Sequence, residues 1–195
     1  MKFDSSGTQS TIAPGSLSPD KQWEYRSDQE SDYLPAIVKV STTEVVVHLT
    51  KVDEGTVHTT DPVIVWAPDS KRFAFNYSPP HKNHTSWETI ALYQLRGDKW
   101  VALRSPISKY SERTQLAQLA QLAKERLPKS DPEQDSLRVR NWTDANTAIL
   151  YDSSFRVGSL SKLNFLFTLK FDAEGNPKIV KTHQMSDSEV DESNQ

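Results

Sequence analysis

Two histidines stand three residues apart in the segment His81-Lys82-Asn83-His84, close to Trp87 and Glu88. Imidazole nitrogens bind zinc and related metals, so the pair could contribute two ligands. No third ligand stands at a fixed spacing, and a polar loop that contains two histidines is the simpler explanation. We therefore predict no metal and no cofactor, and interpret this loop as a contact surface for a ligand or partner. Its candidate contact residues are Tyr77, His81, His84, Trp87 and Glu88.

Three aspartates follow proline or threonine in similar settings: Asp20, Asp69 and Asp144. Glycosidases use carboxylate pairs, but an aspartate in such a turn usually accepts hydrogen bonds from nearby backbone amides. We therefore interpret all three as turn residues and predict no catalytic residue.

Other nucleophile and phosphate motifs are missing from the sequence. It contains no Gly-x-Ser-x-Gly elbow, no cysteine, and only six glycines with no phosphate-binding loop among them. These observations favour a protein that is not an enzyme. A metal-dependent or other hydrolase that uses residues 78–88 is the alternative.

Composition excludes further classes of function. The net charge is −3 and the pI is about 6.0, without the concentrated basic surface that nucleic-acid binding requires. No apolar run approaches the ~18 residues of a membrane span. We therefore expect a soluble protein with neither nucleic acid nor a membrane span. Residues 1–7 lack the apolar region of a signal peptide, so we expect a cytoplasmic protein, or a periplasmic or secreted one if a signal was trimmed.

Short runs rich in β-branched and aromatic residues alternate with turn signals along most of the chain. The clearest is residues 63–104, where two strands flank Ala67-Pro68-Asp69-Ser70-Lys71 and two more flank Arg96-Gly97-Asp98-Lys99. Four strands joined by three short connections form an antiparallel meander. Residues 17–50 and 136–183 follow the same order, which predicts three meanders.

The segment Trp66-Ala67-Pro68-Asp69-Ser70-Lys71-Arg72-Phe73-Ala74-Phe75 resembles the W-S-P-D-G-K-x-I-A-F motif of TolB-like and WD-repeat β-propeller blades. Weaker copies occur at Leu17–Lys21 and Asn141–Asp144, and the glycine of the motif is absent from all three. The resemblance implies propeller-like blades, although three are fewer than the four to eight of a closed propeller. Either the sheets form an open stack, or two chains complete a ring as a homodimer.

Residues 111–127 predict one amphipathic helix, because their leucines and alanines recur at three- and four-residue spacings. Ser111 is its expected N-cap, and Pro128 marks its end. We expect residues 1–16 to be a flexible lead-in, residues 17–185 one β-rich domain, and the acidic tail 186–195 to be disordered. An α+β fold, with a curved sheet and the helix packed on it, is the alternative.

Together these features favour a non-catalytic binding or protein-interaction module of propeller-like type, whose partner is a protein or a small molecule. A self-assembling structural subunit is a further alternative.

Overall fold

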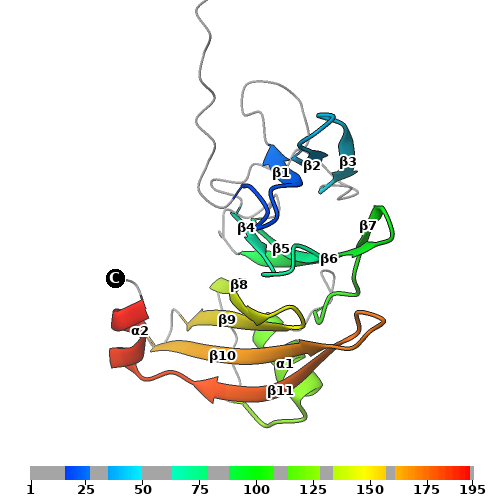
Figure 1. The fold of residues 1–195 in the computed structure, drawn as a ribbon. Coiled ribbons are helices and arrows are strands. Elements are labelled where there is room, and N and C mark those ends of the chain that lie inside the picture. Colours follow the sequence, from blue (N-terminus) through cyan, green and yellow to red (C-terminus); the bar gives the residue numbers. More distant parts are fainter. Residues whose placement is uncertain are drawn as a thin grey trace, which may run out of the picture.

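The computed structural model describes residues 16–26, 35–49, 63–78, 88–107, 114–127, 134–156 and 161–193. The fold is mainly β, as the sequence predicts, and its three antiparallel sheets follow one another along the chain (Figure 1). The first sheet contains β1 (Trp23–Arg26), β2 (Ala36–Lys39) and β3 (Val45–His48). The middle sheet contains β4 (Val63–Trp66), β5 (Arg72–Tyr77), β6 (Thr89–Arg96) and β7 (Lys99–Ala102). The last sheet contains β8 (Gln134–Asp144), β9 (Thr147–Arg156), β10 (Ser161–Phe171) and β11 (Pro177–Gln184).

The first meander has three strands where four were expected. Its missing strand is reduced to one bridge, in which Leu17 pairs with Glu24. The equivalent pair in the middle sheet, 49 residues further along the chain, is Trp66 with Phe73. This pair stands at the end of the full strand β4.

The turns that precede β1 and β5 have the same hydrogen bonds. The amide of Ser18 donates to the carbonyl of Trp23 over 2.9 Å, and the amide of Ala67 donates to that of Arg72 over 2.9 Å. Lys21 and Ser70 both adopt left-handed backbone conformations, with φ of 60° and 57°. Because glycine adopts this region without steric cost, these two residues stand where a glycine would be favoured.

The turn role of the three aspartates is confirmed. Each side-chain oxygen accepts a hydrogen bond from the amide two residues further on. The distances are 3.1 Å for Asp20, 3.1 Å for Asp69 and 2.7 Å for Asp144.

The middle sheet is covered on both faces. All six residues of β5 are buried, because alternate side chains enter two different cores. On one face Phe73 and Phe75 join Trp23 and Ile37 of the first sheet in an aromatic cluster. On the other face Ala74 joins a larger cluster with the last sheet. In Figure 1 the sheets therefore appear as layers in chain order.

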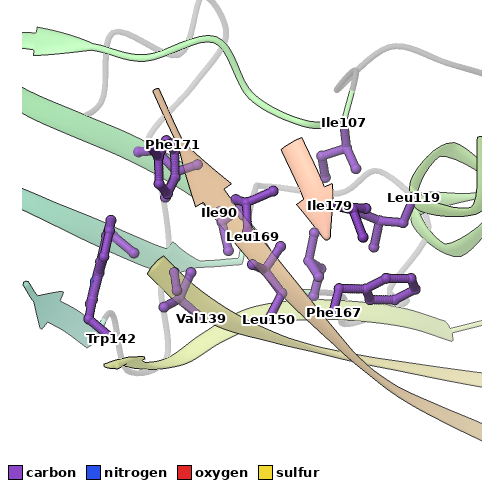
Figure 2. Close-up of a cluster of buried hydrophobic side chains, with 14 of the residues drawn as sticks. Ile90, Ile107, Leu119, Val139, Trp142, Leu150, Phe167, Leu169, Phe171 and Ile179 are labelled. Atoms are coloured by element: carbon purple, nitrogen blue, oxygen red, sulfur yellow. The ribbon is translucent and has the colours of Figure 1, made fainter. Parts of the chain in front are cut away.

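Helix α1 (Gln115–Ala123) covers the rest of the inner face of the last sheet. Leu119 lies near Phe167 and Ile179, as Figure 2 shows. The predicted N-cap Ser111 lies outside the described residues, and the observed N-cap is Thr114, whose hydroxyl accepts from the amide of Ala117 over 3.0 Å. The helix also ends before residue 127, because Lys124 turns left-handed with φ of 60°. This packing fits the α+β alternative equally well.

The acidic tail contains a short helix where disorder was expected. Helix α2 (Asp187–Ser193) begins after Ser186, whose amide donates to the Glu189 carboxylate over 2.7 Å. The amide of Glu189 bonds to the Ser186 hydroxyl in return. This reciprocal pair is a capping box, which satisfies the first amides of a helix. The tetrapeptide Ser186-Asp187-Ser188-Glu189 carries this signal in the sequence.

Candidate binding face

Two of the five predicted contact residues lie in the described part of the chain. Tyr77 is only 8% exposed, and its ring stacks on Phe75 with centroids 5.1 Å apart in the aromatic core. It therefore offers little surface to a partner. His81, His84 and Trp87 lie outside the described residues, so the prediction for this loop stays a prediction.

Glu88 joins the middle and last sheets through its main chain. Its carbonyl accepts hydrogen bonds from the amide of Leu137 over 3.0 Å and from the side chain of Gln115 over 2.8 Å. Its amide donates to the Ser136 hydroxyl over 3.3 Å. The main chain of Glu88 is thus anchored at the start of β8 in a structural role, and the residue is partly exposed.

A buried pair of carboxyls, Asp135 and Asp152, is the strongest concentration of acidic chemistry in the described residues. The Ser154 hydroxyl lies 3.0 Å from an oxygen of Asp135 and 3.1 Å from one of Asp152. Burial raises the pKa of both carboxyls, and the charge of Asp135 raises that of Asp152 further. Asp152 therefore keeps its proton well above the pH at which an exposed carboxyl loses it.

This pair has a structural role. Asp135 accepts a hydrogen bond from the Gln115 amide at the start of α1, and so ties the helix to β8. Asp152 has no exposed surface and Asp135 is 6% exposed, so neither can reach a substrate in solvent. The two carboxylates of a glycosidase flank an accessible bond, which this arrangement lacks.

The outer face of the last sheet, directed away from α1 and the middle sheet, is the candidate binding face. Pairing places Arg138 opposite Tyr151, Tyr151 opposite Leu166, and Leu166 opposite His183. A second row runs through Asn141, Ile149, Thr168 and Lys181. None of these side chains belongs to either core cluster, whereas the alternate residues Leu137, Val139, Ala148, Leu150, Phe165, Phe167 and Leu169 do.

Basic side chains gather on this face. Six lysines and arginines project from its four strands or from a β-bulge within them: Arg138, Arg140, Lys162, Lys170, Lys178 and Lys181. Within the described ranges, none of the six forms a salt bridge. The acidic groups lie at the ends of the face: Asp144 ends β8, Asp172 and Glu174 stand in the β10–β11 turn, and Glu189 belongs to α2. Lys170 contributes to the lowered pKa of Asp144, after the hydrogen bonds from Asn146 and Thr147.

An apolar ridge runs along the middle of the face. It consists of Ile149, Tyr151 and Phe155 on β9, together with Leu166 on β10, all partly exposed. The Arg138 guanidinium lies 5.1 Å from the centre of the Tyr151 ring, a cation–π contact. The Tyr151 hydroxyl donates to the Asn164 side chain over 2.7 Å. These contacts hold the ring in one orientation at the centre of the face.

At one corner of the face, His183 pairs with Glu189 of α2, with 2.8 Å between nitrogen and oxygen. The hydrogen bonds from Ser186 and His183 lower the pKa of Glu189 to about 2. The acidic helix is therefore fixed beside the basic face by a carboxylate that stays ionised in mild acid.

An open groove of about 720 Å³ lies on the opposite side of the last sheet, between α1 and the β10–β11 turn. It is lined by Arg104, several amide side chains and two prolines. Its mixed lining presents one cation, so it selects no ligand class as clearly as the basic face does.

The binding face could not be predicted from the sequence, because its residues come from four strands. Alternation in Leu137-Arg138-Val139-Arg140 places basic residues on one side of β8, and Lys178 and Lys181 are visible in β11. The register that aligns these strands includes bulges at Arg140 and Val180, which only the structure shows.

Among the described residues, no group of three or more histidines or acidic residues is arranged to hold a metal, and no helix is long and apolar enough to cross a membrane. No family model, curated protein or solved structure matches this chain.

Proposed function

We propose that the protein is a non-catalytic binding module that engages a negatively charged protein partner through the outer face of the last sheet. The observation that carries this proposal is the set of six basic side chains on one sheet face of a chain whose net charge is −3. Between Asp144 and Glu189, no outward-facing strand position carries an acidic residue. Such separation of charge steers an oppositely charged partner to one surface.

The architecture of the module is also part of the proposal. We infer that the sheets are degenerate blades of the TolB-like or WD-repeat type. Supporting this are the matching turns before β1 and β5 and the left-handed backbone at Lys21 and Ser70, where the motif has its glycine. A ring closed by two chains is less well supported, because it would bury the cations of the last sheet, and buried charges without partners are costly.

A charge-neutralised variant and a matched control test the proposed function. Lys170→Gln, Lys178→Gln and Lys181→Gln are combined in one protein, and Lys39→Gln, Lys71→Gln and Lys99→Gln in the control. All six lysines are exposed, but the control lysines lie on the first two sheets. The anisotropy of a labelled oligoglutamate peptide measures binding.

The face variant should bind the peptide about tenfold or more weakly than the wild type, because each charge contact contributes a few tenths of a kcal/mol or more. The control should keep the wild-type affinity, and binding should weaken as salt is raised. Equal losses in the two variants, or no binding to the wild type, would count against the proposal.

A further inference from the structure

The arrangement of apolar and basic residues on the binding face restricts the form of its partner. Ile149, Tyr151 and Leu166 lie on the two central strands. Arg138 and Arg140 flank them on β8, and Lys181 and His183 flank them on β11. An apolar ridge bordered by cations on both sides is complementary to an apolar stripe bordered by acids on both sides.

We infer that the partner element is an acidic amphipathic helix that lies along this ridge, an inference that rests on the proposed function. The exposed apolar surface of a sheet is commonly covered by helices, as the inner face of this same sheet is covered by α1. From Ile149 to Phe155 the ridge extends for about 20 Å, at ~3.3 Å per strand residue. A helix of about 13 residues has that length.

The other ways of binding an extended polyanion fit this face less well. A peptide strand binds by pairing with a sheet edge, whereas the apolar ridge lies on the two central strands, β9 and β10. Single-stranded nucleic acid requires aromatic rings free for stacking. The Tyr151 ring has Arg138 over it, and Ile149 and Leu166 are aliphatic, so Phe155 is the one ridge ring without such a cover among the described residues.

Two synthetic peptides of identical composition test the inference on the full chain. One places leucines at i, i+3, i+4 and i+7 with glutamates on both sides of the stripe, and the other is a shuffled sequence without a stripe. A single-stranded oligonucleotide of similar charge is the third probe. Fluorescence anisotropy gives the affinities, and circular dichroism reports helix formation on binding.

We expect the amphipathic peptide to bind about tenfold more tightly than the shuffled one and to become helical when bound. The combined variant Ile149→Ser and Leu166→Ser should lose this preference. The control, Val63→Ser with Val101→Ser, changes two exposed valines of the middle sheet and should keep it. If the ridge variant fails to fold, NMR of the isotopically labelled wild type takes its place. The amide chemical shifts that change on adding the amphipathic peptide should be largest along β9 and β10.

The outcomes separate the two proposals. Equal affinity for both peptides, lost in the lysine variant, would overturn the helical partner and leave the proposed function standing. A preference that survives the ridge substitutions, or shifts that lie elsewhere, would also overturn the helical partner. Tighter binding of the oligonucleotide would overturn the protein partner in favour of nucleic acid. If no probe binds, both proposals are wrong.

Discussion

The side-chain amide of Asn76 forms two hydrogen bonds with the main chain of Val139, each 2.9 Å long. Asn76 thereby takes the place of a strand residue and joins the middle sheet to β8. Trp142 reinforces this junction, because its indole nitrogen donates to the carbonyl of Val65 over 3.0 Å. Arg72 extends it to the β8–β9 turn, where its guanidinium donates to Asn146 over 2.6 Å. The position of the binding face relative to the other sheets depends on these contacts.

Substituting Asn76 by alanine should lower the free energy of unfolding by about 2–4 kcal/mol. Asn76 and Val139 are buried, so the substitution leaves an amide and a carbonyl without partners, and each such loss costs ~1–3 kcal/mol. Urea denaturation measures the change. Asn141→Ala, at an exposed position of β8, is the control and should change the midpoint little. An unchanged midpoint for Asn76→Ala would show that the two sheets are held together without this side chain.

The strands could be predicted from the sequence because alternation and turn chemistry are local. The pattern from Arg72 to Tyr77 and the Pro68-Asp69 turn each identify their structure within a few residues. The partner of each sheet could not be predicted, because contacts such as Asn76 with Val139 join residues far apart in the chain. The binding face depends on strand register, and the bulge at Arg140 shifts that register by one residue.

Two glycines with left-handed backbones should respond differently to alanine. Gly175 has φ of +83°, and an added Cβ would collide with the Gln94 side chain and lie 2.6 Å from Leu103 Cδ2. Gly97 has φ of +62° and open space around it. Gly97→Ala should cost about 1 kcal/mol from the backbone alone. Gly175→Ala should cost about 1–3 kcal/mol more, because overpacking adds to that strain.

Thermal unfolding monitored by circular dichroism compares these two variants directly. Equal shifts in the melting temperature would mean that the β10–β11 turn moves away from β6 without cost, and would contradict the packing described above.

Asp152→Asn should make the stability of the protein less dependent on pH. The pKa of Asp152 is raised in the folded state, so the unfolded chain releases its proton at lower pH than the folded chain does. The stability that the protonated form provides is therefore lost progressively as pH rises above the ordinary carboxyl range. Asparagine stays neutral and can still donate a hydrogen bond to Asp135. Urea midpoints across mildly acidic to neutral pH should fall less for the variant than for the wild type.

Asp172→Asn is the matched control with the opposite sign. The hydrogen bonds from the side chain and the amide of Asn176 lower the pKa of Asp172. Its contribution is therefore present above the ordinary carboxyl pKa and is lost as pH falls. This variant should be less stable than the wild type at neutral pH and approach it in acid. If both variants shift the profile in the same direction, Asp152 is not protonated in the folded protein.

The capping box of α2 should persist in mild acid, because the pKa of Glu189 is about 2. Its stabilising effect is fully present above the ordinary glutamate pKa and is lost as pH falls from there toward about 2. Carbon-detected NMR titration of the Glu189 carboxyl should give a midpoint near 2. His183→Gln should raise this midpoint, because it removes the second of the two main partners. Ser186→Ala should raise it less, because the first partner is the backbone amide of Ser186, which alanine retains. A wild-type midpoint near 4.5, the ordinary value for glutamate, would mean that α2 does not hold its cap in solution.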